Sequence, residues 1–166
     1  MRKAIAVMAG VLLLAAVNWG IYARERLLAD GRVVLMELAP VDPRSLMQGD
    51  FMALRFKVAS EVLQAGGSSN APAENGRIVV KLDERGVGSY VRRDGGGPLG
   101  QGEVALVYRI RNGQVKFATN GFFFQEGSAQ DYQRARYGEF RVAPSGDLLL
   151  ARLRGENLER LGPAQH

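Results

Sequence analysis

The strongest hydrophobic pattern in the chain is a run of apolar residues near its N-terminus. Residues 4–23 carry no formal charge. An α-helix rises about 1.5 Å per residue, so a helix over this run is about 30 Å long, which matches the hydrocarbon core of a bilayer. Trp19 and Tyr22 lie near its far end, and such side chains favour the membrane interface. The pattern predicts a transmembrane helix within residues 1–23, with residues 4–23 in contact with the lipid bilayer.

Charged residues beside this run predict its orientation. Arg2 and Lys3 precede it, and basic residues stay on the cytoplasmic side of a membrane. The alternative is a cleaved signal peptide, but residues 21–23 make a poor Ala-x-Ala site and the run exceeds the roughly 7–15 residues of a signal's apolar region. We therefore expect an uncleaved signal-anchor with a cytoplasmic N-terminus, followed by a helical stem over residues 24–31.

The pattern then changes to alternation. In residues 51–58, Met52, Leu54, Phe56 and Val58 share one face, and this period of two predicts a half-buried strand. Residues 64–76 are rich in Gly, Ser and Asn and predict a loop. Further strands are predicted at residues 32–38, 77–82, 88–93, 103–110, 114–118, 121–124, 137–142 and 147–153.

Turn signals complete the fold prediction. Asn112-Gly113 between two alternating runs is a strong hairpin signal, because both central positions of a type I′ turn need positive φ. Ser128 is typical of a helix N-cap, which predicts one short helix ending at Arg136. We expect an all-β domain over residues 32–155, a small sandwich or barrel of about seven to nine strands. Residues 156–166 are expected to form a polar tail that is frayed or helical.

Composition narrows the chemistry. The chain has no cysteine, and its only histidine is the terminal residue His166. These counts exclude thiolate chemistry and disfavour histidine-based catalysis, so we expect no cofactor and no metal site. The net charge is +5, but the arginines are scattered among acidic residues, so a nucleic-acid partner is not expected. Residues 95–100 match a phosphate-loop spacing, but a strand rather than a helix is predicted after them.

The connection before the 51–58 strand is the best candidate for a site. Asp42, Arg44, Asp50 and Arg55 lie in or near it, and together with Glu126 they are the candidate binding residues. The alternative is structural: Asp42 and Asp50 cap turns, and the aromatic side chains fill the core. No catalytic residue stands out.

Two blocks of sequence resemble a known family. The first comprises residues 40–46 and the motif Gly49-Asp50-Phe51-x-x-Leu54-x-Phe56; the second comprises residues 121–129 and 137–142. Both blocks resemble the GDYXXLXY family of membrane-anchored bacterial proteins, over residues 33–154. Phenylalanine replaces tyrosine at both aromatic motif positions, which favours packing over a role for a hydroxyl group.

The resemblance implies an N-terminal anchor in the bacterial inner membrane and an uncharacterised periplasmic domain. It also implies a multi-pass membrane protein as a neighbour, because family members are often encoded beside one. We therefore expect a non-enzymatic interaction or accessory domain. One alternative is a domain that binds a small ligand or hydrolyses a substrate through Asp42, Asp50 and Glu126. Another is a degenerate relative of the signal peptidase β-fold, in which Val41 occupies the position of the nucleophilic serine.

Two further features carry structural expectations. In residues 122–124 three consecutive phenylalanines cannot share one face of a strand, so Phe123 is expected to point away from its neighbours, covered by the short helix or exposed to a partner. An ion-pair network or a solvated surface is expected from the charged residues near the motif, which are Arg44, Arg55, Glu126, Arg134, Arg136 and Glu139.

Overall fold

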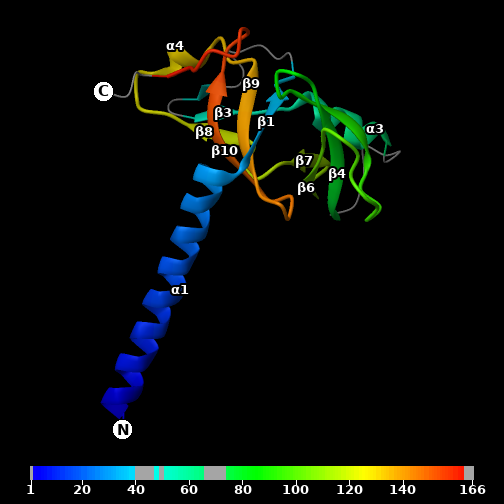
Figure 1. The fold of residues 1–166 in the computed structure, drawn as a ribbon. Helices are drawn as coiled ribbons and strands as arrows, with labels where there is room; N and C mark the ends of the chain where they lie inside the picture. The colour runs from blue at the N-terminus through cyan, green and yellow to red at the C-terminus, as the bar shows by residue number, and fades with distance from the viewer. Residues whose placement is uncertain (1, 40–46, 49–50, 66–73, 163–166) are drawn as a thin grey trace.

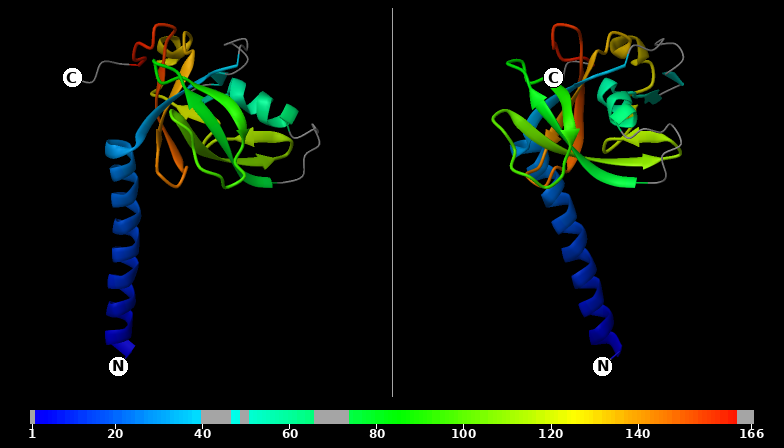
Figure 2. Two further views of the ribbon diagram at one scale, coloured as in Figure 1. Left: turned by 45° about the vertical axis from the view of Figure 1, so that its right-hand side comes forward. Right: turned by 90° about the vertical axis from the view of Figure 1, so that its right-hand side faces the viewer.

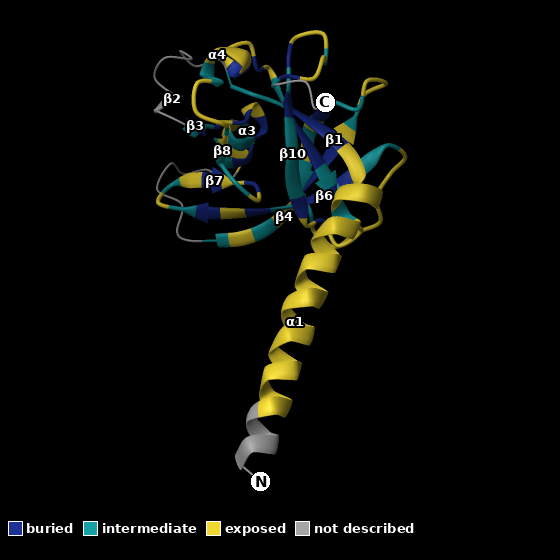
Figure 3. Cartoon of the chain, turned by 90° about the vertical axis from the view of Figure 1, so that its left-hand side faces the viewer, coloured by how far each residue is buried: buried dark blue, intermediate teal, exposed yellow. Residues whose placement is uncertain are grey.

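A long helix leads into a β-rich domain (Figure 1). The computed structural model describes residues 2–39, 47–48, 51–65 and 74–162, with side chains from residue 7 onward except at residues 47–48. The helix α1 (Arg2–Asp30) is continuous and projects from one end of the domain (Figure 2). Its Val7–Asp30 part is long and apolar enough to cross a membrane, and its side chains are exposed along nearly its whole length (Figure 3).

Gly31 forms the junction between α1 and the domain. The Gly31 amide donates to the Leu27 carbonyl at 2.9 Å, which closes the last turn of the helix. The Gly31 carbonyl accepts a hydrogen bond from Arg141 at 3.3 Å. A Cβ added at Gly31 would overlap the Leu27 carbonyl oxygen and lie 3.0 Å from the Arg141 Cβ. Glycine therefore lets the chain turn directly from the helix into the first strand.

The described strands form three antiparallel sheets, which makes the domain all-β as predicted. The first has the order β1-β9-β10 and the second the order β2-β3-β8, while the third has the order β5-β4-β6-β7. Their bounds are β1 (Arg32–Glu37), β2 (Met47–Gln48), β3 (Phe51–Ala53), β4 (Glu74–Leu82), β5 (Gly88–Arg93), β6 (Glu103–Arg111), β7 (Gln114–Lys116), β8 (Gly121–Phe123), β9 (Tyr137–Val142) and β10 (Leu148–Arg154).

One hydrophobic core joins these sheets. Residues that alternate along the strands point into it and are almost fully buried, among them Val34, Met36, Ile78, Val80, Leu106, Ile110, Phe140 and Leu153. Backbone hydrogen bonds also link the sheets, from the Leu35 amide to the Gly86 carbonyl and from the Val107 amide to the Gly146 carbonyl, both at 2.9 Å. The alternation of apolar residues therefore gave the correct core faces.

The hairpin at Asn112-Gly113 is confirmed. It joins β6 to β7, and the φ angles of Asn112 and Gly113 are 54° and 69°. Both values lie in the left-handed region that a type I′ turn requires, and Asn and Gly adopt this region more readily than other residues.

The strand predicted over residues 51–58 was wrong in part. The strand predicted over residues 51–58 ends at Ala53, and residues Lys57–Ala65 form a second domain helix, α3, which was not expected. Val58 and Val62 are its buried residues, four positions apart. The error has a simple cause: Val58 fits the end of an alternating strand and the start of an amphipathic helix equally well.

The helix predicted from Ser128 exists but is short. It is α4 (Ala129–Tyr132), and the Ser128 side chain makes no capping hydrogen bond. The helix stops before Arg136 because the chain has to enter the sheet there, where the Arg136 amide donates to the Arg154 carbonyl at 2.9 Å.

The ends of two predicted loops also differ. β4 begins at Glu74, inside the predicted 64–76 loop, because residues 74–76 pair with β6. The segment after β10 packs back on the domain: the Leu161 amide donates to the Leu153 carbonyl at 3.2 Å, and the Leu161 side chain is only 6% exposed. The expectation of a frayed or helical tail was therefore wrong for residues 156–162, since Leu161 joins the core.

Candidate functional site

The second half of the sequence motif is part of the core. Met52, Leu54 and Phe56 are exposed by only 4%, 2% and 1%, so the expected burial of Leu54 together with Phe56 is confirmed. The Phe56 ring lies 5.3 Å from the ring of Phe140 and 6.2 Å from that of Phe117, in edge-on geometry. These contacts give Phe56 a structural role in packing β9 against the segment that follows β7.

Phe51, the first described residue of the motif, lies at the surface. Phe51 is half-buried in β3, which pairs with β8 so that Phe51 is opposite Phe123 and Ala53 is opposite Gly121. The Phe51 and Phe123 rings are 5.1 Å apart. A Cβ at Gly121 would overlap the Phe51 ring, so only glycine lets the ring lie across β8. We refer to Phe51, Gly121 and Phe123 as the motif face.

Phe123 is the most exposed large hydrophobic side chain among the described residues of the β domain, at 76%. Its neighbours Phe122 and Phe124 point the other way and pack on Tyr132 of α4, with ring centroids 5.0 and 5.3 Å apart. The expectation that Phe123 points away from its neighbours is confirmed. Of the two alternatives for Phe123, coverage by the short helix does not hold, because Phe122 and Phe124 pack on α4 from the opposite face of β8 and Phe123 is exposed.

The polar residues predicted to form a site are only partly described. Arg55 and Glu126 are exposed, and no ion pair within the described residues involves either of them. Asp42, Arg44, Gly49 and Asp50 lie outside the described residues. A shared cleft of Asp42, Asp50 and Glu126 therefore stays a prediction.

Glu139 forms an ion-pair cluster, but its partners differ from those expected. Its carboxylate is 2% exposed and faces Arg141, Arg152 and Arg154 at distances of 3.9, 3.4 and 2.6 Å. Arg134 and Arg136 are exposed and do not take part in it. Arg154 also donates to the Leu158 carbonyl at 2.8 Å, and Arg141 donates to the Gly31 carbonyl. The cluster thus links β9 and β10 to the folded-back tail and to the end of α1.

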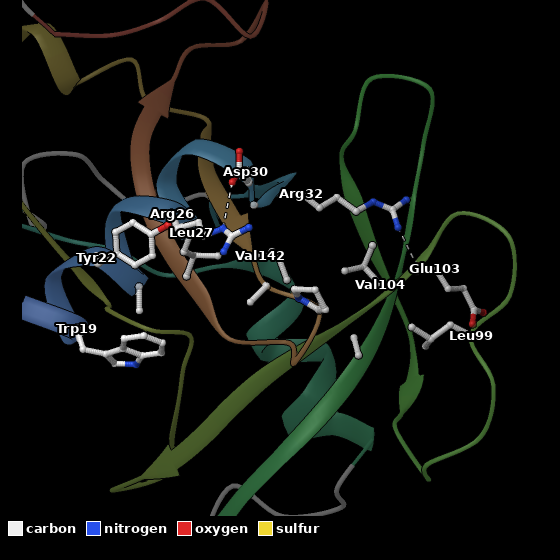
Figure 4. Close-up of a pocket in the computed structure, with 15 residues that line it drawn as sticks. Trp19, Tyr22, Arg26, Leu27, Asp30, Arg32, Leu99, Glu103, Val104 and Val142 are labelled. Carbon is white, nitrogen blue, oxygen red and sulfur yellow. Dashed lines mark hydrogen bonds and ion pairs between the residues drawn. The ribbon is translucent and has the colours of Figure 1, made fainter. Parts of the chain in front are cut away.

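A cavity lies where α1 meets the domain, and we call it the junction groove (Figure 4). Its volume is about 690 Å³. One wall is a single face of α1, and the other comes from β6, the β9–β10 turn and the loop before β6. The lining residues are Trp19, Tyr22, Ala23, Arg26, Leu27, Asp30, Gly31, Arg32, Leu99, Glu103, Val104, Ala105, Val142, Ala143 and Pro144.

Among the described residues, some charged side chains that line the junction groove are paired with an opposite charge, and one is not. Arg26 pairs with Asp30 at 3.6 Å, and Arg92 donates to both oxygens of Glu103 at 2.7 and 2.9 Å. These hydrogen bonds from Arg92, aided by the Gly100 amide, lower the pKa of Glu103 to about 2, so the carboxylate stays ionised and engaged. Arg32 contacts only the Glu103 carbonyl, at 3.4 Å, and is paired with no carboxylate in the described part of the chain.

No cluster of three or more His, Cys, Asp or Glu side chains within the described ranges is suited to hold a metal ion. Two features of the described residues remain as candidate binding surfaces: the motif face, for another protein, and the junction groove, for a small molecule or lipid. Neither was predicted as a unit, since each combines residues distant in sequence.

Of the comparisons with known proteins, only the one with family models gave a match. Comparison with curated proteins gave no match, and comparison with solved structures also gave none. A family model described as "GDYXXLXY protein" matches residues 13–153, which is most of the chain and includes the second half of α1, the motif face and Glu139. The chain belongs to the GDYXXLXY family.

Proposed function

We propose that this protein is a membrane-anchored accessory domain that binds a neighbouring membrane protein through its motif face. The observation that carries the proposal is Phe123, which is 76% exposed on β8, the end strand of the sheet that the described strands β2, β3 and β8 form, in a domain attached to a long apolar helix. Soluble surfaces seldom leave a large aromatic side chain beside an unpaired strand edge, because both promote association.

The pairing of Phe51 with Phe123 supports the same proposal. Aromatic side chains are enriched among the residues that dominate the energy of protein interfaces. Gly121 holds the Phe51 ring against β8, so the two rings form a preorganised apolar surface. Figure 3 shows β3 and β8 beyond the domain end of α1 and to one side of its axis, so the proposed partner contacts them with a part that extends out of the membrane.

The partner is tested by recovering the full-length tagged protein from its native membranes in mild detergent. Phe123→Ser is expected to reduce recovery of a co-purifying membrane protein about 30-fold, the effect of losing about 2 kcal/mol at an interface. Gly121→Ala removes no aromatic group but displaces the Phe51 ring, so it is also expected to weaken recovery.

Val91→Ser is the matched control, because Val91 is 41% exposed on β5, in a different sheet from the motif face. It is expected to leave recovery unchanged. The proposal fails if the wild-type chain is recovered alone in every detergent, or if all three variants retain the same partner. Circular dichroism of each variant checks that the fold persists.

We also propose that the anchor lies in the bacterial inner membrane, with its N-terminus in the cytoplasm and the β domain in the periplasm. Arg2 and Lys3 support this orientation. A C-terminal reporter that is active only in the periplasm is expected to give signal, and one that is active only in the cytoplasm is expected to give none. The reverse pair of results would show that the orientation is inverted.

A further inference from the structure

The junction groove lies where the apolar helix leaves the span and meets the domain. The α1 residues that line it are Trp19, Tyr22, Ala23, Arg26, Leu27 and Asp30. Their spacing of three and four places them on one face of the helix, over about 16 Å of its length. Across this distance the lining changes from aromatic to charged, and Figure 4 shows Trp19 and Tyr22 at one end and Arg32 and Glu103 at the other.

This order of side chains matches the order of layers in a membrane. If α1 spans the bilayer with residues 4–23, the Trp19 end lies at the edge of the hydrocarbon and Arg26 lies in the headgroup layer, which is about 5–8 Å thick. The domain wall adds apolar side chains from Leu99, Val104 and Pro144. The groove therefore has an apolar side toward Trp19 and a charged side, where Arg26 and Arg32 lie beside the carboxylates Asp30 and Glu103.

The charges favour an anionic headgroup. Arg32 has no carboxylate partner among the described residues, and Glu103 is held by Arg92. Arg26 pairs with Asp30, but both side chains are about 70% exposed, at 69% and 73%, and such surface pairs contribute little. Two guanidinium groups are thus available to a phosphate, which arginine binds well through its planar fork of donors.

We propose that the junction groove binds an anionic phospholipid of the membrane in which α1 sits, with its phosphate at the charged side that carries Arg26 and Arg32 and an acyl chain toward Trp19. The change from aromatic to charged lining favours lipid over an apolar partner helix, because a lipid changes from acyl chain to phosphate in the same order. This inference rests on the proposed membrane placement of α1 and is independent of the motif face.

Trp19 provides a direct probe, because it is the only tryptophan of the chain and it lines the groove. The full-length protein is placed in nanodiscs of phosphatidylcholine that contain a small fraction of chain-brominated lipid, which quenches tryptophan fluorescence on contact. Brominated phosphatidylglycerol is expected to quench Trp19 more strongly than brominated phosphatidylcholine at the same mole fraction.

The arginine variants test whether the groove causes this preference. Arg26→Gln and Arg32→Gln are each expected to lower the preference for phosphatidylglycerol about fivefold, the effect of about 1 kcal/mol per arginine near an anionic lipid surface. Arg32→Lys is expected to retain part of it. Arg24→Gln is the control: Arg24 is exposed on α1 near the same membrane depth, but it lies about 100° or more around the helix from Trp19 and Arg26 and does not line the groove.

Several outcomes overturn the inference. Equal quenching by the two lipids shows a span without a selective lipid site, so the membrane placement survives and the lipid site fails. Equal losses in Arg24→Gln and Arg26→Gln show a general attraction to anionic membranes. No quenching by either lipid shows a groove closed to lipid, as in occupation by the helix of a partner or a second copy. Failure of the protein to enter nanodiscs removes the membrane placement itself.

Discussion

Phe56→Ala is expected to lower the free energy of unfolding of the β domain by about 3–5 kcal/mol. The Phe56 ring is 1% exposed and contacts the rings of Phe117 and Phe140. The edge of the Phe56 ring also lies against Gly138, where an added Cβ would be 3.0 Å from a ring carbon. Gly138 has no side chain that could fill the space left by the ring. Removing the ring therefore leaves a cavity between the strands. Urea unfolding of the full chain in detergent micelles, followed by circular dichroism, measures the change.

Phe51→Ala is the matched control for this prediction, because it removes the other aromatic side chain of the same motif. Phe51 is half-buried at the surface, so its loss is expected to cost about 1–2 kcal/mol, below the cost at Phe56. Equal costs at the two positions would contradict the assignment of Phe56 to the core and Phe51 to the surface. The same pair of variants in the partner-recovery experiment should show the opposite order, with Phe51→Ala the more damaging to binding.

Local patterns predicted most of the strands, because a strand with one buried face carries its own period of two. The Asn112-Gly113 hairpin was predictable for the same reason, since the turn chemistry lies within the turn itself. The failure at α3 shows the limit of such patterns. Val58 satisfies both the strand and the helix period, and only the packing of Val62 into the core decides for the helix.

The motif face was not predictable because it depends on the pairing of distant strands. Phe51 and Phe123 come together only through the register of β3 with β8. A sequence pattern shows that Phe123 points away from Phe122 and Phe124, but it does not show what lies on either side. The predicted direction of the Phe123 side chain was therefore correct, but the sequence left open whether the short helix covers it.

The Glu139 cluster carried a weak signal in the sequence. Glu139 and Arg141 are two positions apart on β9, as are Arg152 and Arg154 on β10, so each pair points to one face of its strand. Pairing these strands places one acidic and three basic side chains together. The prediction included Glu139 in a possible network with Arg44, Arg55, Glu126, Arg134 and Arg136, and it missed Arg141, Arg152 and Arg154 because the register of the hairpin was unknown.

Glu139→Gln is expected to lower the free energy of unfolding by about 2–4 kcal/mol. Removing one partner of a buried ion pair costs about 3–5 kcal/mol, and the lower range applies here because the three arginines are partly exposed. Their side chains are 22%, 28% and 34% exposed, while the carboxylate is 2% exposed. Glutamine keeps the size of the side chain but leaves three neighbouring positive charges without a counterion. Arg141 and Arg154 then hold the end of α1 and the folded-back tail less firmly.

The control for Glu139→Gln is Glu37→Gln, the same chemical change at an exposed ion pair. Glu37 lies 3.2 Å from Lys57, and their side chains are 44% and 57% exposed, so the loss is expected to stay below about 1 kcal/mol. Urea unfolding of both variants in micelles gives the comparison, and amide hydrogen exchange at residues 156–162 reports the release of the tail. If Glu139→Gln is no more damaging than Glu37→Gln, the carboxylate does not hold the cluster together. A large loss without faster exchange in the tail would instead locate its effect within the β9–β10 hairpin.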